Sequence, residues 1–115
     1  MFKRYSHTMF YSLQLDNAVK WYCSKLGFEI DYHAPGVYAS LHHKAVGRIA
    51  LHATTVKTDI GAGPMPYFIA DSLDAAIKHF KNENVEHSEP RREGESPRFM
   101  HFKDLDGNFI GVEEM

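Results

Sequence analysis

A chain of 115 residues with 43% hydrophobic and 24% charged side chains is long enough to bury the core of one soluble domain. Its net charge of −2 offers no basic surface for nucleic acid, and no apolar run approaches the ~20 residues of a membrane span. The single cysteine excludes an internal disulfide, and without a signal-like apolar stretch near the first residues the sequence predicts a cytoplasmic protein.

The first half of the sequence predicts one helix among four strands. Strand-like residues run from Arg4 to Leu13. A helix follows from Leu15 to Leu26, because apolar residues recur at i, i+3, i+4, i+7 and i+11. Gly27 is placed to end this helix in the left-handed conformation. Three further strands are expected at Phe28–His33, Val37–His43 and Arg48–Ala53.

The second half repeats this pattern after a polar, glycine-containing linker at residues 54–64. Ser72 is a plausible N-cap for a helix with an apolar stripe from Leu73 to Phe80. Asp106-Gly107-Asn108 predicts a tight turn between the last two strands. The expected strands are Met65–Ala70, Val85–Arg91, Arg98–Lys103 and Phe109–Glu113.

The two predicted helices also match each other residue by residue. Leu15–Tyr22 and Leu73–Phe80 share four identical positions, and two more exchange Val for Ile and Tyr for Phe. The offset, 73 − 15 = 58, is about half of the 115 residues. We therefore expect two near-equal modules, 1–53 and 65–115, with a cleft between them as the place for chemistry.

The segment 102–110, with its Asp106-Gly107-Asn108 turn, resembles the vicinal oxygen chelate superfamily, which includes glyoxalase I, bleomycin-binding proteins, fosfomycin-resistance enzymes and extradiol dioxygenases. The stretches Trp21–Phe28 and His7-Thr8-Met9 strengthen the resemblance. It covers the whole chain, 1–115, as a single glyoxalase-like domain. The implied fold is α+β, with two βαβββ modules forming a curved mixed sheet around a cleft.

Metal-dependent members of this superfamily take their ligands from the first and fourth strands of each module. His7 matches the first ligand position. The other three positions fall on Ala50, Met65 and Gly111, none of which supplies the nitrogen or carboxylate ligand of such a site. An open catalytic metal site normally needs about three protein ligands, so glyoxalase I activity itself is not expected.

A second set of residues lies two positions further along the same strands. His52 follows Ala50, and Glu113 follows Gly111, so each should face the same side as the residue it follows. With His7 they would form a two-histidine, one-carboxylate metal site, and the resemblance makes His101 a cleft-lining residue that could join His7 and Glu113 in catalysis. The alternatives are a hydrogen-bonded cleft histidine for His7, exposure for His52 and a surface carboxylate for Glu113.

Three function classes follow. The first is a metal-free protein that binds a small organic molecule in an aromatic cleft; the second is a lyase or transferase that uses a divalent transition metal to polarise vicinal oxygens. The third is an accessory or regulatory domain. A homodimer is expected, because pairing would cover the edges of small sheets. The candidate cleft residues are Tyr5, Tyr11, Tyr38, Arg48, Tyr67, Phe99 and Phe109.

Overall fold

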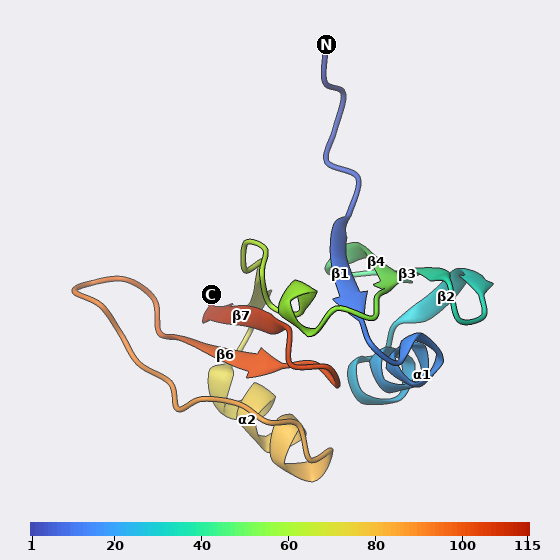
Figure 1. Ribbon diagram of the computed structural model, residues 1–115. Helices are drawn as coiled ribbons and strands as arrows, with labels where there is room; N and C mark the ends of the chain where they lie inside the picture. Colours follow the sequence, from blue (N-terminus) through green and yellow to red (C-terminus); the bar gives the residue numbers. More distant parts are fainter. The chain divides into compact units, whose positions relative to one another are not determined.

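The computed structural model describes residues 1–115 and divides into two compact units, Met1–Ile60 and Gly61–Met115. The division falls within the segment 54–64 that the sequence predicts as a linker. Each unit contains one sheet with one helix packed against it (Figure 1), which is the α+β class that the sequence predicts. No helix combines the length and the apolar character that a membrane crossing requires.

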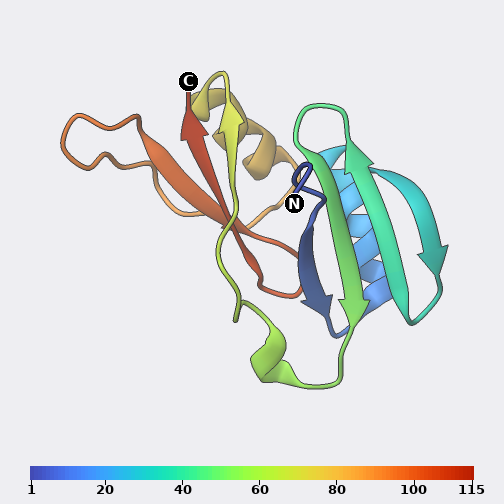
Figure 2. The same ribbon diagram turned by 90° about the horizontal axis from the view of Figure 1, so that it is seen from above.

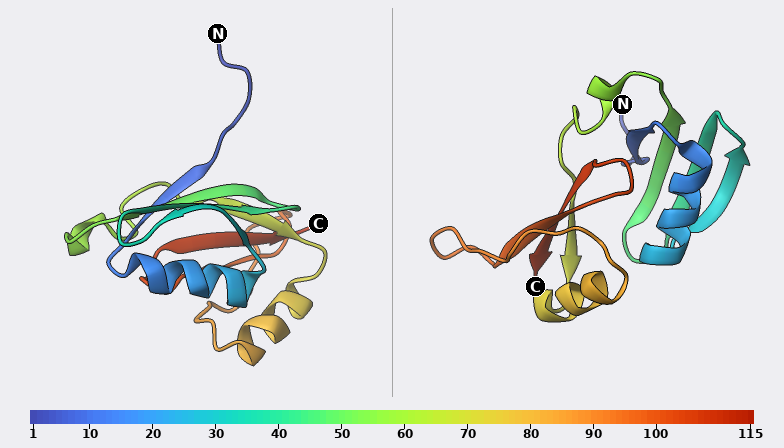
Figure 3. Two further views of the ribbon diagram at one scale, coloured as in Figure 1. Left: turned by 90° about the vertical axis from the view of Figure 1, so that its right-hand side faces the viewer. Right: turned by 60° about the horizontal axis from the view of Figure 1, so that its bottom comes forward.

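Unit one holds a four-stranded sheet in the order β1-β4-β3-β2 (Figure 2). β1 and β4 are parallel, whereas β4, β3 and β2 pair antiparallel. Helix α1 lies along one face of this sheet (Figure 3). The elements are β1 (Thr8–Ser12), α1 (Leu15–Leu26), β2 (Glu29–Ala34), β3 (Tyr38–His43), β4 (Gly47–Ala53) and a short 3-10 helix at Lys57–Asp59.

Helix α1 forms where the apolar stripe predicts it. Its buried side chains Leu15, Ala18, Val19 and Tyr22 lie on the stripe that faces the sheet. Gly27 ends the helix at φ 76°, a left-handed conformation that glycine adopts without strain. The buried residues on the facing side of the sheet are Phe10, Ala39, Leu41, Ile49 and Leu51.

Unit two holds a three-stranded sheet in the order β5-β7-β6. β5 (Tyr67–Ala70) runs parallel to β7 (Phe109–Glu114), and β6 (Phe99–Lys103) pairs antiparallel with β7. Helix α2 (Leu73–Asn82) begins at the predicted cap, since the Ser72 Oγ accepts a hydrogen bond from the Ala75 N–H at 3.2 Å. The matching segments Leu15–Tyr22 and Leu73–Phe80 thus lie in the corresponding helix of each unit.

Three predicted strands are shorter in the structure, and the one expected at Met65–Ala70 begins at Tyr67. The first begins at Thr8 instead of Arg4, and the residues before it extend away from the sheet of unit one (Figure 1). The segment predicted as a strand at Val85–Arg91 makes only two isolated bridges to β6, from His87 to Phe102 and from Arg91 to Phe99. Pro90 lies between these bridges and has no N–H to donate, so a continuous ladder cannot form there.

The turn between β6 and β7 is built around one buried carboxylate. Oδ1 of Asp104 accepts hydrogen bonds from the backbone N–H groups of Asp106, Gly107 and Asn108 at 2.9–3.0 Å. Oδ2 accepts from the side-chain amide of Asn108 at 2.9 Å. Gly107 has φ 104°, a conformation that favours glycine. The Oδ1 of Asn108 in turn accepts from the Gly61 N–H at 2.8 Å, which attaches the end of the predicted linker to unit two.

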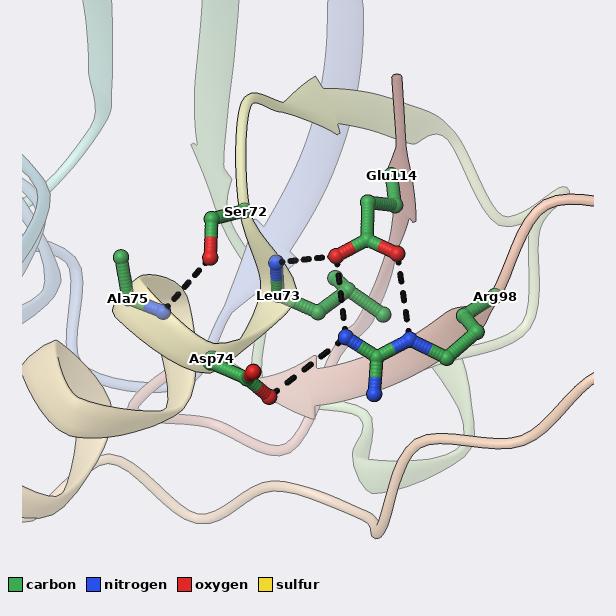
Figure 4. A network of polar contacts seen from close by, with 6 residues as sticks. All are labelled: Ser72, Leu73, Asp74, Ala75, Arg98 and Glu114. Carbon is green, nitrogen blue, oxygen red and sulfur yellow. Dashed lines mark hydrogen bonds and ion pairs between the residues drawn. The ribbon is translucent and has the colours of Figure 1, made fainter.

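A charged network fixes the first turn of α2 to the last strand of unit two (Figure 4). Arg98 donates to both carboxylate oxygens of Glu114, at 3.1 and 2.9 Å. The same carboxylate accepts from the Leu73 N–H at 3.1 Å, so it also neutralises the positive end of the helix. The Arg98 hydrogen bonds and the Leu73 N–H lower the pKa of Glu114 from 4.5 to about 2.

This network predicts a defined response to acid. A carboxylate whose pKa is lowered on folding stabilises the fold above its unfolded pKa, and the contribution disappears as the pH falls from about 4.5 to about 2. Glu114→Gln should therefore lose less stability than the native chain over this interval, as measured by urea unfolding at each pH. Equal slopes for Glu114→Gln and the native chain would contradict the assignment.

Candidate functional site

We call the face of each sheet that its own helix does not cover the open face of that unit. On the open face of unit one, an aromatic row crosses all four strands. The His52 ring lies 6.5 Å from the ring of Tyr11 and 4.7 Å from that of Tyr38, and Tyr38 lies 6.2 Å from Tyr32. The register brings these residues together, since His52 pairs with both Tyr11 and Tyr38. Such a row presents edges and faces on which a planar molecule can stack.

A polar cluster lies on the same open face, near the other end of strands β3 and β4. The two ring nitrogens of His42 contact different carboxylates. Nδ1 lies 2.6 Å from the carboxylate of Asp31, and Nε2 lies 3.2 Å from that of Glu29. The Arg48 Nε lies 3.5 Å from the other oxygen of Asp31. Because the two ring nitrogens of His42 point in opposite directions, the side chains of His42, Asp31 and Glu29 do not converge on one metal ion.

Small residues separate the aromatic row from the polar cluster. Ser40 pairs with Ala50 on the adjacent strand, and Ala50 pairs with Met9 on the next one. Ala50 is buried although it lies on the open face. Ser40 and Ala50 therefore lie between the aromatic row and the polar cluster on this face.

Two further candidates of unit one, His7 and Tyr5, lie outside the paired part of the sheet. His7 precedes the first paired residue, is exposed and has its Nδ1 2.8 Å from the Ser6 Oγ. Tyr5 is also exposed, and its hydroxyl is hydrogen-bonded to that of Thr8. Arg48 belongs to the polar cluster described above. A groove of about 550 Å³ at the end of the sheet is lined by Ser12, Leu13, Leu15, Gly36, Ala53, Thr54 and Thr55, and it contains no titratable side chain.

The open face of unit two carries the aromatic candidates Phe99 and Phe109 beside His101. The His101 and Phe109 rings meet edge to face at 5.2 Å. The Lys103 ammonium lies 5.3 Å from the centre of the Phe109 ring, and the Arg91 guanidinium lies 5.2 Å from that of Phe99. Both distances are in the range of cation–π interactions, which favour a ring face turned toward the cation.

His101 borders a hollow of about 210 Å³ that the sequence did not indicate. Its backbone N–H donates to the Ser88 Oγ at 3.0 Å, and Lys103 is paired with Glu86 at 2.9 Å. The lining residues are Glu86, His87, Ser88, His101 and Lys103. The residues before β6 that fail to form a strand thus contribute polar side chains next to His101.

Tyr67 covers the neighbouring strand at Gly111. The two residues are paired in the parallel ladder of β5 and β7. A Cβ placed on Gly111 would lie 2.5–2.6 Å from three carbons of the Tyr67 ring, a distance that real side chains do not reach. Gly111 is buried, whereas Tyr67 remains 46% exposed, so one face of the ring lies on the strand and much of the ring stays accessible.

Each half of the chain contains a sheet with a parallel edge strand and one helix packed on it. The protein is therefore an α+β protein built from two similar modules. The chain belongs to the Glyoxalase/Bleomycin resistance protein/Dioxygenase superfamily, whose family model matches residues 4–112. This confirms the family that the sequence motifs indicate. No curated protein sequence matches the chain.

Solved structures of this fold are similar over nearly the whole chain. A lactoylglutathione lyase from Agrobacterium tumefaciens is 18% identical, with a TM-score of 0.77 over 96% of this chain and 92% of that one. A bleomycin-binding protein from Streptomyces verticillus in complex with copper(II)-bleomycin is 15% identical, with a TM-score of 0.79 over 100% and 99%. The fosfomycin resistance protein FosX from Listeria monocytogenes is 15% identical, with a TM-score of 0.80 over 100% and 95%. At these identities the similarity establishes the fold and not the ligand.

The residues at the four family ligand positions do not fit a divalent metal. His7 offers an imidazole, but Ala50 and Gly111 have no donor atom and Met65 has only a thioether. The Tyr67 ring also covers Gly111. In neither unit are three His, Cys, Asp or Glu side chains grouped so that they could hold a metal ion. Whether His7, His52 and Glu113 meet at a common point stays a prediction.

Proposed function

We propose that this protein binds a small organic molecule with a planar, conjugated part, and that it does so without a metal at the positions its superfamily uses. The observation that carries the proposal is the aromatic row of Tyr11, His52, Tyr38 and Tyr32 on the open face of unit one. Stacking and burial of a flat ligand on such a row need no metal. A relative of the same fold has been crystallised with bleomycin, which supports binding of organic ligands by this architecture.

A binding experiment tests this proposal directly. Acridine and naphthol serve as planar probes in calorimetric titrations of protein kept in a metal chelator. Tyr38→Ala should weaken binding by about tenfold, because it removes a stacking partner together with buried apolar area. Val56→Ala, an exposed apolar residue outside the row, is the control and should bind as the native chain does. Binding that the chelator abolishes, or that Tyr38→Ala leaves unchanged, would contradict the proposal.

The second candidate function is a metal-dependent lyase or transferase that uses His7, His52 and Glu113. It is supported by the matched two-residue shift, since His52 lies on the same face as Ala50 and Glu113 on the same face as Gly111. A metal held there would polarise vicinal oxygens of a substrate. His101 and Glu113 would be the candidate groups for moving a proton.

Metal analysis separates the two candidates. If the shifted set is a site, protein purified without added metal should carry a near-stoichiometric transition metal, and His52→Ala or Glu113→Gln should remove it. His79→Ala, on helix α2, should leave the metal content unchanged. A native chain that takes up no zinc, nickel, iron or manganese in titrations would exclude the metal-dependent candidate. A chain that binds neither metal nor planar probes would instead be an accessory or regulatory domain.

We also propose that the protein acts as a cytoplasmic homodimer. The edge strand β2 is exposed along its first four residues, with Ile30 50% and Tyr32 60% accessible. An exposed edge with apolar side chains favours pairing with a second chain. Light scattering coupled to gel filtration should give twice the mass of 13.2 kDa at micromolar concentration. A single species of monomer mass would contradict this part of the proposal.

A further inference from the structure

We infer that Tyr67 and Gly111 form a matched pair in which the tyrosine ring occupies the space of a family metal ligand and supplies an aromatic surface in its place. The first observation is the contact itself. A Cβ on Gly111 would lie 2.5 Å from Cε2 of Tyr67 and 2.6 Å from both Cδ2 and Cζ. The ring therefore rests on the Cα of Gly111, where any other residue type would place a side chain.

The backbone of Gly111 gives no other reason for a glycine. Its φ is not positive, unlike that of Gly107 in the preceding turn, so an alanine could adopt the same conformation. The residue lies inside β7, and its N–H donates to the Pro66 carbonyl at 2.8 Å. Glycine in the interior of a strand weakens the strand and often marks a close approach by another group. Here the approaching group is the Tyr67 ring.

The contact between Tyr67 and Gly111 explains why this position cannot carry the metal-ligand side chain that the superfamily resemblance assigns to it. The resemblance places a ligand side chain at Gly111, and the first atom of that side chain would collide with the Tyr67 ring. The second candidate position of this unit, Met65, lies two residues before Tyr67 and carries a thioether. Unit two thus offers an aromatic ring that is 46% exposed where related proteins offer a metal ligand.

This arrangement selects a class of ligand and, in that respect, rests on the proposed function. A metal centre in this fold suits small molecules with two adjacent oxygens. A tyrosine ring with one face on the strand suits instead a planar aromatic or conjugated group, held by stacking of about 0.5–1.5 kcal/mol, or roughly two- to tenfold in affinity. Tyr67 is therefore a specificity-determining contact for unit two.

The contact is tested by a cycle of variants read by thermal unfolding. Gly111→Ala should lower Tm in the native background, because the new Cβ displaces the Tyr67 ring. In a Tyr67→Ala background the same Gly111→Ala change should raise Tm, because alanine suits a strand better than glycine. If Gly111→Ala alone does not fold, the double variant should restore folding. A Tm change of the same sign in both backgrounds would overturn the pair.

The ligand part is tested with acridine as the probe. Tyr67→Leu, which keeps an apolar side chain but removes the ring, should weaken binding two- to tenfold, and Tyr67→Phe should preserve it. Val56→Ala is again the control. Unchanged binding by Tyr67→Leu, together with the loss expected for Tyr38→Ala, would leave the proposed function intact and overturn the ligand role of Tyr67. Absence of acridine binding by the native chain would refute both binding claims, whereas the Tm cycle would still decide the contact.

Discussion

Asp104→Asn is expected to lower the free energy of unfolding by about 2–4 kcal/mol, although it preserves the shape of the side chain. The carboxylate is 6% exposed and accepts three backbone N–H bonds and one from the Asn108 amide. An asparagine would direct its own NH₂ at that of Asn108. Turning the Asn108 amide would relieve this conflict only by directing its NH₂ at the Gly61 N–H. Either orientation of the Asn108 amide therefore loses one hydrogen bond of the native turn.

Urea unfolding followed by circular dichroism measures this loss. Asp71→Asn makes the same chemical change at an exposed carboxylate of unit two and should alter stability by no more than about 0.5 kcal/mol. Equal unfolding midpoints for Asp104→Asn and Asp71→Asn would show that the turn does not depend on the carboxylate.

Tyr22→Ala is expected to remove about 3–5 kcal/mol, which is enough to unfold many domains of this size. Tyr22 is fully buried, and its ring meets those of Trp21 and Phe28 edge to face at 5.2 and 5.7 Å. Truncation would leave a cavity between α1 and the sheet of unit one. Because this sheet carries the aromatic row, probe binding should fail together with the fold.

Two further variants identify the cause of this loss. Tyr22→Phe should lose less stability than Tyr22→Ala, because it keeps the buried ring and removes only the hydroxyl. Lys20→Ala, at an exposed site on α1, should change stability little, since alanine is the best helix former. A loss for Lys20→Ala as large as that for Tyr22→Ala would point to helix formation and not to core packing.

The helices could be predicted closely because their signals are local. The stripe from Leu15, the left-handed Gly27 and the Ser72 cap are all properties of neighbouring residues, and all three appear in the structure. The strand at 85–91 could not be predicted in this way. Its alternation is compatible with a sheet, but the missing N–H of Pro90 and the pairing with β6 decide the outcome.

The candidate site depends on register, which the sequence does not reveal. Tyr11 and Tyr38 could be named as cleft residues, whereas Tyr32 was not, and the order of the row follows from the pairing of β1, β4 and β3. The polar cluster was missed because it depends on the pairing of Glu29 with His42 and of His42 with Arg48, which alternation within a single strand does not reveal. The pairing of Arg98 with Glu114 across the sheet likewise depends on register.

The hydrogen bond from Gly61 to Asn108 determines where the chain can be divided into separately expressed halves. A second half that began at Met65, the first residue of the predicted module, would lack the Gly61 N–H and so lose its hydrogen bond to the Asn108 Oδ1. A half that begins at Gly61 retains this donor. When the second half is expressed alone, residues 61–115 should therefore resist urea unfolding better than residues 65–115.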